Sequence, residues 1–369
     1  MKIAFIYFPG RLSRLAKVKA GQGASEFFYG SVQLLEWGDE VEIFELKDKT
    51  KVSFGKIVGD YLYKWNLLPD SANGSMIMNI KELCPYFKKF DVVVGTSPGI
   101  SFALSLCRTL RLFDQPIVGF YCGQADYIPT WLRRKMNSYF LRRTWAQLYS
   151  ETEFDVLSKT LNVPHERLII NQFGVDLNFW TPGNDPEGDY VLSVGNDSRR
   201  DYDLLAKVAS KINYPFIIVT KLPIKETIPP NMKIISGKWD LAELSDGELR
   251  DLYRRAKCVV IPLKESLQAA GQSVCLQAMA CGKPVILTRT RGIWSRSMMR
   301  DGENIIIVMP GDEDALGQKI KHIMSNPSER ERIGQNARLT ACNEADIRSF
   351  AHRLRQTCKM ALENKKGWG

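Results

Sequence analysis

Three residues suited to binding an anion form a short turn between a predicted strand and a predicted helix. The turn consists of Gly271, Gln272 and Ser273. Residues 261–263 are an apolar run typical of a buried strand, and residues 274–280 have the apolar spacing of a helix. The backbone amides and the dipole at such a helix N-terminus favour negative charge. The pattern predicts an anion-binding site, although it also fits an ordinary strand–loop–helix unit whose glycine only makes the turn.

Positively charged side chains follow two further predicted strands, residues 190–194 and 216–219. The residues just beyond these strand ends are Gly195, Asn196, Arg199, Arg200 and Lys221. Open α/β sheets bind ligands beyond the carboxyl ends of their strands, and a guanidinium can bind a diphosphate through two parallel hydrogen bonds. The alternative is a solvated arginine pair at the start of a helix, with aspartates beside it.

A glycine-bearing segment follows the first predicted strand, residues 3–7. The segment reads Gly21-Gln22-Gly23-Ala24-Ser25-Glu26, and basic side chains precede it. Glu26 stands where the dinucleotide-binding pattern Gly-x-Gly-x-x-Gly requires its last glycine, so that pattern is excluded. We expect residues 9–24 to form a basic loop suited to an anionic substrate, with a flexible surface loop as the alternative.

Predicted strands alternate with predicted helices along the whole chain of 369 residues. The strands of the first half are residues 3–7, 41–46, 91–96, 117–121, 147–150 and 169–170, and the alternation restarts at residue 190. This order predicts an α/β fold with doubly wound parallel sheets. Residues 182–189, between the two halves, are rich in glycine, proline and aspartate, a composition typical of a linker.

The segment that follows the Gly-Gln-Ser turn resembles a known family. Residues 277–285 read Gln-Ala-Met-Ala-Cys-Gly-Lys-Pro-Val and resemble the donor-binding segment of retaining glycosyltransferases with the GT-B fold, of the family 4 or group 1 type. That family carries two glutamates in this region. The second falls on Gln277, whose carbonyl oxygen can still accept hydrogen bonds from ribose hydroxyls. The first falls on Ala269, which has no polar group, and Glu265 lies four residues too early.

Residues 147–182 carry a second part of the resemblance, which covers the passage from one domain to the next. The matching residues are Ser150, Val163, Pro164, Asn171, Gly174, Val175, Asp176 and Pro182. The resemblance implies two Rossmann-like doubly wound domains facing each other across a cleft. It places an acceptor-side domain at residues 1–177, a linker at 178–189 and a nucleotide-sugar-binding domain at 190–345. A C-terminal helix within residues 346–369 would cross back to the N-terminal domain.

The resemblance also implies which residues bind a nucleotide diphosphate sugar. They are Gly21, Gly23, Gly195, Asn196, Arg199, Arg200, Lys221, Gly271, Gln272, Ser273 and Gln277. Family members bind the donor diphosphate with a Gly-Arg loop and a later lysine. Here Asn196 follows Gly195, so Arg199 or Arg200 would make the arginine contact and Lys221 the lysine contact.

Many relatives carry a histidine after the strand that matches residues 117–121, and residues 122–126 of this chain contain none. Asp126 is the ionisable carboxylate there and is our catalytic candidate, to orient the acceptor or accept its proton. The alternative is a surface aspartate that caps the next helix. The sequence contains no cluster with metal-ligand spacing, so we predict no protein-bound metal and no cofactor, with the nucleotide sugar as a substrate.

The composition fits a globular enzyme, with 44% hydrophobic and 25% charged residues. No apolar run reaches the roughly 18 residues of a membrane span, and the N-terminal apolar run is too short for a signal peptide. The eight cysteines lack metal-binding spacing and fit reduced thiols. We therefore expect a cytoplasmic location, with peripheral attachment to the inner membrane face as a further expectation.

A basic segment with aromatic residues lies at residues 130–145, in a chain whose formal net charge is +10. Its basic residues are Arg133, Arg134, Lys135, Arg142 and Arg143, and Trp131 and Trp145 flank them. A basic amphipathic helix of this kind suits an anionic membrane surface. The alternative is a helix with its apolar face in the domain core and its arginines in water. Nucleic acid is the less favoured partner, because no RNA-binding motif accompanies the charge.

Three functions fit these observations. The first is a retaining glycosyltransferase that moves a sugar from a nucleotide diphosphate sugar to an acceptor hydroxyl, in polysaccharide or glycolipid synthesis. The second is a nucleotide-sugar epimerase with the GT-B fold. The third is a catalytically weakened member of the fold that acts as a binding or partner subunit, which Ala269, Asn196 and the missing histidine favour.

Overall fold

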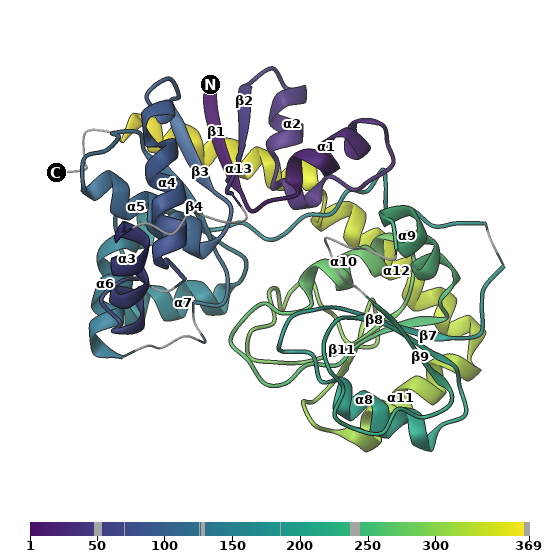
Figure 1. Cartoon of the computed structure of the whole chain (residues 1–369). Helices are drawn as coiled ribbons and strands as arrows, with labels where there is room; N and C mark the ends of the chain where they lie inside the picture. Colours follow the sequence, from purple (N-terminus) through teal and green to yellow (C-terminus); the bar gives the residue numbers. More distant parts are fainter. Residues whose placement is uncertain are drawn as a thin grey trace. The chain divides into compact units, whose positions relative to one another are not determined.

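A computed structural model describes residues 1–47, 54–69, 71–124, 126, 130–184, 186–236 and 244–364. The chain forms two compact units, whose elements can be followed along the sequence in Figure 1. The first unit contains Met1–Ala16, Phe27–Gln172 and Arg348–Gly369. The second contains Lys17–Glu26 and Phe173–Ile347.

The sheet of the first unit has six parallel strands in the order β2-β1-β3-β4-β5-β6. The strands are β1 (Lys2–Tyr7), β2 (Glu40–Glu45), β3 (Val92–Gly95), β4 (Ile117–Tyr121), β5 (Trp145–Leu148) and β6 (Leu168–Ile170). The central strands β3 and β4 are apolar and buried along their whole length. Such continuous apolar strands are typical of a parallel sheet that is covered on both faces.

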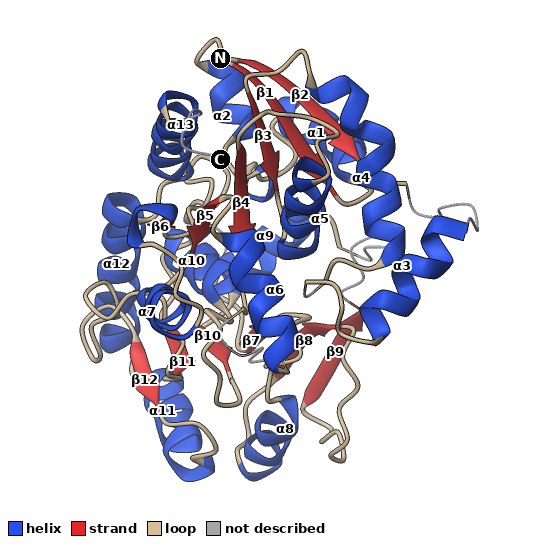
Figure 2. Cartoon of the chain, turned by 90° about the vertical axis from the view of Figure 1, so that its left-hand side faces the viewer, coloured by secondary structure: helices blue, strands red, loops and turns tan. Residues whose placement is uncertain are grey.

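Helices cover both faces of this sheet (Figure 2). The helices in the segments of the first unit are α1 (Arg11–Lys19), α2 (Ser31–Glu36), α3 (Phe54–Lys64), α4 (Gly74–Phe87), α5 (Pro98–Thr109), α6 (Trp131–Leu141), α7 (Glu151–Thr160) and α13 (Ile347–Glu363), of which α3 packs on α4. Ala4 of β1 packs in one buried cluster with Ile80 of α4 and Ile100 of α5. On β4, the ring of Phe120 stacks on the ring of Phe350 from α13, with the centroids 5.7 Å apart.

The sheet of the second unit also has six parallel strands, in the order β12-β11-β10-β7-β8-β9. The strands are β7 (Val191–Val194), β8 (Phe216–Thr220), β9 (Met232–Ser236), β10 (Cys258–Ile261), β11 (Val285–Thr288) and β12 (Ile306–Val308). The helices are α8 (Tyr202–Lys211), α9 (Asp246–Arg255), α10 (Gln272–Ala280), α11 (Glu313–Ser325) and α12 (Pro327–Glu344). Leu205 of α8 and Ile320 of α11 share a buried cluster with Val191 and Val260 of the sheet.

The predicted α/β fold with two doubly wound parallel sheets is confirmed. The prediction that residues 9–24 form a loop was wrong, because Arg11–Lys19 is the helix α1. No glycine or proline interrupts these nine residues, and Gly21, at φ 69°, follows the helix end. The strand predicted at residues 261–263 lies earlier, at β10, since Pro262 has no amide hydrogen to continue the ladder.

The single helix predicted over residues 130–145 was also wrong in its extent. Helix α6 ends at Leu141, and Trp145 is the first residue of β5, where it is buried. Trp145 is therefore part of the sheet and does not flank an amphipathic helix. None of the helices in the described part of the chain is long and apolar enough to cross a membrane.

The last helix, α13, belongs to the first unit from Arg348 onwards. Besides the contact of Phe350, Gln147 of β5 donates a hydrogen bond of 3.1 Å from Nε2 to Oγ1 of Thr357. Residue 185 of the predicted linker and residues 365–369 of the predicted C-terminal segment lie outside the described residues. The domain boundaries inferred from the sequence stay predictions.

Candidate functional site

The strand order of the second sheet reverses at β7, which lies between β8 and β10. In open α/β sheets the crevice for a ligand forms beyond the carboxyl ends of the strands at such a switch point. Two loops meet there, one after β7 and one after β10. The amide of Asp201 donates to the carbonyl of Pro262 at 3.0 Å, and the amide of Lys264 donates to the carbonyl of Arg199 at 2.8 Å. The loop carrying the two arginines is therefore fixed beside the loop that leads into α10.

The guanidinium of Arg200 lies between two glycines at this point. A Cβ atom on Gly195, just after β7, would lie 2.1 Å from Nε of Arg200. A Cβ atom on Gly271, just before α10, would lie 3.1 Å from its Nη1. Both glycines have positive φ, 152° and 80°, so their backbone conformation also disfavours other residues. The two glycines together leave the space that the guanidinium occupies.

The positive charge of Arg200 is buried beside the carboxylate of Asp197. The arginine side chain is 2% exposed, and its Nε lies 3.0 Å from Oδ2 of Asp197. Its Nη1 is buried and has no hydrogen-bond partner in the described part of the protein. A buried guanidinium normally has its donors satisfied, because an unpaired buried charge is costly. The geometry therefore fits a site that is completed by an anion.

The N-terminus of α10 adds further donors next to Arg200. Gly271 is its N-cap residue and provides no side-chain cap, so the first-turn amides of Gln272 and Ser273 have no partner within the helix. The side-chain Nε2 of Gln272 is buried and, among the described residues, is also without a partner. The dipole of this nine-residue helix favours negative charge at the same end. The turn predicted from the sequence to bind an anion thus lies beside Arg200.

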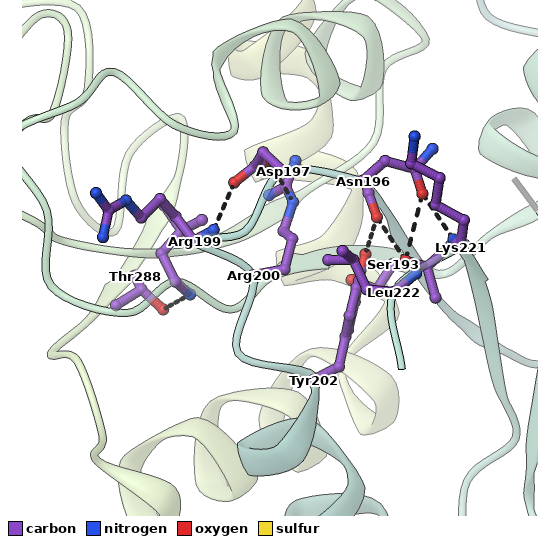
Figure 3. A network of polar contacts seen from close by, with 12 residues as sticks. Ser193, Asn196, Asp197, Arg199, Arg200, Tyr202, Lys221, Leu222 and Thr288 are labelled. Atoms are coloured by element: carbon purple, nitrogen blue, oxygen red, sulfur yellow. Dashed lines mark hydrogen bonds and ion pairs between the residues drawn. The ribbon is translucent and has the colours of Figure 1, made fainter. Parts of the chain in front are cut away.

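Asn196 and Lys221 join the ends of β7 and β8, as Figure 3 shows. Oδ1 of Asn196 accepts a hydrogen bond of 2.7 Å from the backbone amide of Lys221. The carbonyl of Gly195 accepts from Oγ1 of Thr220 at 2.7 Å and from the hydroxyl of Tyr202 at 3.0 Å. Asn196 therefore orders the loops, while Lys221 is exposed at the strand end.

Arg199 and Arg200 differ in position although they are adjacent. Figure 3 shows their side chains pointing in different directions. The amide of Arg199 donates to Oδ1 of Asp197 at 3.2 Å. Only the Arg200 guanidinium lies between the two glycines, so Arg200 is the better candidate for an anion at α10.

Gln277 is already engaged within the second unit. Its Nε2 donates to Oε1 of Glu26 at 2.9 Å, and its Oε1 accepts from the hydroxyl of Tyr253 at 3.2 Å. Glu26 Oε1 also accepts from Nε1 of Trp180 at 2.8 Å. Gln277 is buried, so its observed contacts are those of a core network, and its role toward a ribose stays a prediction.

Glu26 is the residue of this network that the sequence analysis missed, since it was considered only as an absent glycine. The carboxylate is fully buried, and its Oε2 is without a hydrogen-bond partner among the described residues. Burial raises its pKa to about 7, although the hydrogen bonds from Gln277 and Trp180 act in the opposite direction. The sequence signal that could have indicated a buried Glu26 is its position between a segment of small residues and two phenylalanines.

Two aspartates of the second unit accept hydrogen bonds from the segment that precedes Glu26. The amide of Ala24 donates to Oδ2 of Asp246 at 3.2 Å, and Oγ of Ser25 donates to Oδ2 of Asp176 at 2.7 Å. A Cβ atom on Gly23 would lie 3.1 Å from Oδ2 of Asp246, so a glycine suits this close approach. Gly21 and Gly23 thus have structural roles, and their contact with a donor stays a prediction.

Asp126 lies after β4 in the first unit and is half-buried. A second carboxylate, that of Glu153 in the first turn of α7, is fully buried and accepts a hydrogen bond from the amide of Gly123. Burial raises the pKa of Glu153 to about 8, and repulsion from Asp126 adds to this rise. Glu153 therefore supports the loop that carries Asp126. The catalytic role of Asp126 stays a prediction, and no group of three or more metal-ligating side chains occurs among the described residues.

Comparison with known proteins shows which family this part of the chain resembles. The family profile described as "Glycosyl transferases group 1" matches residues 241–340, which include β10, the following loop and α10. Over this range the chain is similar to the group 1 glycosyltransferases. Its two parallel sheets are the α/β architecture of the GT-B fold, as the sequence resemblance implied.

Curated relatives of this chain are named as glycosyltransferases. The chain is 27% identical over 217 residues to "MMP alpha-(1->4)-mannosyltransferase" from Mycolicibacterium hassiacum, an alignment that covers 55% of this chain and 50% of that protein. It is also 27% identical over 310 residues to "Putative glycosyltransferase EpsD" from Bacillus subtilis, covering 76% of this chain and 79% of that protein. The match thus spans half the length of the mannosyltransferase.

Solved structures share the fold of this chain at low identity. Sucrose-phosphate synthase from Thermosynechococcus elongatus aligns with a TM-score of 0.71 at 15% identity and covers 98% of each chain. Anabaena HepE in complex with UDP-glucose aligns with a TM-score of 0.67 at 13% identity, covering 98% of this chain and 100% of that one. These similarities support the fold.

The Glu26–Gln277 contact predicts how a carboxylate at position 277 would behave. Gln277→Glu removes the amide donor and places a second carboxylate beside Glu26, so we expect a loss of about 1–3 kcal/mol in the free energy of unfolding. Adding Glu26→Gln restores a carboxylate–amide pair with the roles exchanged and should recover most of this loss. Urea denaturation of both single variants and the double variant measures the coupling. Additive effects would contradict the contact.

The raised pKa of Glu26 predicts a pH dependence of stability. Because its pKa rises from 4.5 in the unfolded chain to about 7 in the folded protein, the folded state binds more protons between these values. The contribution of Glu26 to stability is therefore full below about pH 4.5 and is lost as the pH rises through 7. In thermal unfolding between pH 5 and 8.5, Glu26→Gln should weaken this decline. Glu153→Gln removes a different buried carboxylate, so it should leave unchanged the share of the decline in stability that comes from Glu26. An unchanged slope in Glu26→Gln would refute the assignment.

Proposed function

We propose that this chain is a group 1 glycosyltransferase, which binds a nucleotide diphosphate sugar at the carboxyl edge of its second sheet and transfers the sugar to an acceptor hydroxyl. The observation that carries the proposal is the Arg200 guanidinium, buried between Gly195 and Gly271 at the N-terminus of α10 with an unpartnered Nη1. A diphosphate offers oxygens for this guanidinium and for the first-turn amides of α10 at the same time.

The same contacts would assist the chemical step. When the bond between sugar and diphosphate breaks, negative charge develops on the diphosphate that leaves. A fixed guanidinium and fixed backbone amides stabilise such charge without reorganising, which lowers the barrier. Arg200, Gln272 and Ser273 would make these contacts, and Lys221 would approach the phosphates from the end of β8.

The remaining candidates would act less directly. Asn196 and the two glycines beside Arg200 shape the loops, and Gln277 would reach a ribose only through the oxygen that already accepts from Tyr253. Arg199 would contact a donor by a rearrangement of its side chain. Gly21 and Gly23 would approach the donor through their backbone.

Retention of the anomeric configuration is part of the proposal and rests on the resemblance of residues 277–285 to retaining enzymes. Asp126 would orient the acceptor or accept its proton. A role in polysaccharide or glycolipid synthesis is a further part of the proposal. Uridine diphosphate sugars are the first donors to test, because HepE is described in complex with UDP-glucose.

Product analysis separates the three functions that the sequence left open. A transferase consumes donor only when an acceptor hydroxyl is supplied or when water replaces it. An epimerase converts one nucleotide sugar into another without an acceptor. A binding subunit binds the donor and leaves it unchanged over the same time.

The proposal predicts that Arg200 is the main phosphate contact. Arg200→Ala should weaken binding of a nucleotide diphosphate by about 1.5–3 kcal/mol, the range of a charge-assisted hydrogen bond to a buried group. Arg200→Lys keeps the charge but loses the planar donor pair, so we expect an intermediate loss. Isothermal titration calorimetry with UDP and GDP measures both, with circular dichroism to verify folding.

Arg199→Ala is the matched control, since the neighbouring side chain points elsewhere (Figure 3). It should reduce binding far less than Arg200→Ala. Equal losses in both variants, or wild-type affinity in a folded Arg200→Ala protein, would remove Arg200 from the site.

A further inference from the structure

Helix α3 of the first unit and Trp65, the residue after it, expose a row of large apolar side chains. Phe54 is 83% exposed, Tyr61 and Trp65 are each 61% exposed, and Ile57 and Val58 are exposed as well. Their spacing of three, four, seven and eleven residues from Phe54 places them on one side of the helical path. A contiguous apolar face of this kind on a globular unit indicates an interaction surface.

The packing of α3 explains why its large side chains are left outside. The helix contacts α4 through glycines, since a Cβ atom on Gly59 would lie 2.5 Å from Cα of Gly74. The amide of Gly74 also donates to Oδ1 of Asp60 at 3.0 Å. A helix that packs closely through its small residues presents its large residues on other faces. We define the exposed side chains of Phe54, Ile57, Val58, Tyr61 and Trp65 as the α3 face.

Helix α6 adjoins α3 through Arg133. Its Nη2 donates to the carbonyl of Tyr63 at 2.7 Å, and its guanidinium lies 4.6 Å from the ring centroid of the same tyrosine. Arg133 is buried by these contacts. The expectation that Arg133 is one of five basic groups facing a membrane was therefore wrong, because its guanidinium connects the two helices.

The exposed part of α6 and the two residues that follow it combine aromatic rings with cations. Trp131 is 68% exposed, with Nζ of Lys135 4.3 Å from its ring centroid, and the guanidinium of Arg143 lies 3.6 Å from the ring centroid of Tyr139. Arg142 is exposed beside them. Residues 54–67 and 131–143 together contain seven basic residues and one acidic residue, Asp60. The apolar face of α3 and the basic residues of α6 thus belong to two helices that are in contact at Arg133 and Tyr63.

We infer that the α3 face, with the exposed aromatic and basic side chains of α6, rests on an anionic lipid surface. Aromatic and aliphatic side chains on one side of a helix insert at the boundary between headgroups and acyl chains. Lysine and arginine beside them contact negatively charged headgroups. The observed combination of exposed tryptophans, tyrosines and cations matches both requirements.

Two other occupants fit the observations less well. A second copy of this chain, paired through the same face by a two-fold axis, would bring two positive helices together. A nucleic acid would pair with the cations but leave the aliphatic and aromatic side chains of α3 in water. The lipid surface satisfies both the charge and the apolar area. The inference is independent of the proposed sugar transfer, because no donor-binding candidate lies on these helices.

The test is co-sedimentation of the full chain with vesicles of phosphatidylcholine alone and with about 30% phosphatidylglycerol, a composition that supplies a negative surface potential. We expect the wild type to bind the anionic vesicles and to be released when salt is raised from about 0.1 to 0.5 M, since screening shortens the range of the surface charge. The triple variant Ile57→Ser, Tyr61→Ser, Trp65→Ser should bind at least about tenfold more weakly. The double variant Lys135→Ser, Arg142→Ser should lose the preference for phosphatidylglycerol.

Leu339→Ser is the matched control, because Leu339 is an exposed leucine on α12 of the second unit. It should bind vesicles as the wild type does, and all variants should keep their circular dichroism spectra and their affinity for nucleotide. Unchanged vesicle binding by the triple variant would overturn the inference. Absence of wild-type binding to anionic vesicles would also overturn it. The inference would fail as well if the triple variant changed the oligomeric state in sedimentation velocity and left vesicle binding unchanged.

Discussion

The buried guanidinium of Arg200 is the constraint on which the candidate site depends. A positive charge with a 2% exposed side chain is tolerated only where neighbouring groups or a ligand neutralise it, and Asp197 supplies one carboxylate. The strand order of the second sheet brings the loops after β7 and β10 together around this group. Gly195 and Gly271 leave room for it, and α10 starts beside it. An anion with several oxygens would satisfy the donors that these elements leave open.

The second constraint is the placement of buried carboxylates. Glu26 lies 251 positions before Gln277 in the sequence, yet the two side chains form a hydrogen bond. Trp180 donates a second hydrogen bond to the same carboxylate. Gln277, which occupies the position of a ribose-binding glutamate in the resembling family, therefore donates a hydrogen bond to Glu26 from another segment. This arrangement fixes the segment of residues 17–26 onto the second unit and gives its last residue a structural role. In the first unit, Glu153 similarly supports the loop that carries Asp126.

Much of the fold was predictable because buried parallel strands read as short apolar runs, as in β3 and β4, and because ligand sites of such sheets lie at strand ends. The same rule placed Arg200 and the turn at Gly271 in one region. The direction of a side chain was not predictable, so Arg199 and Arg200 were equivalent until their environments were known. Contacts between distant segments, such as that of Glu26, have no local signal. Arg133 was misjudged for the same reason, since its partner Tyr63 lies in another helix, and the α3 face was missed because exposure depends on which residues pack against α4.

The position of a bound diphosphate tests the candidate site most directly. A crystal structure of the chain with UDP, or with whichever nucleotide diphosphate calorimetry selects, tests this in one measurement. We predict diphosphate oxygens within about 3 Å of the Arg200 guanidinium and of the first-turn amides of α10, at Gln272 and Ser273. A diphosphate bound away from α10, with Arg200 still facing only Asp197, would contradict the central claim.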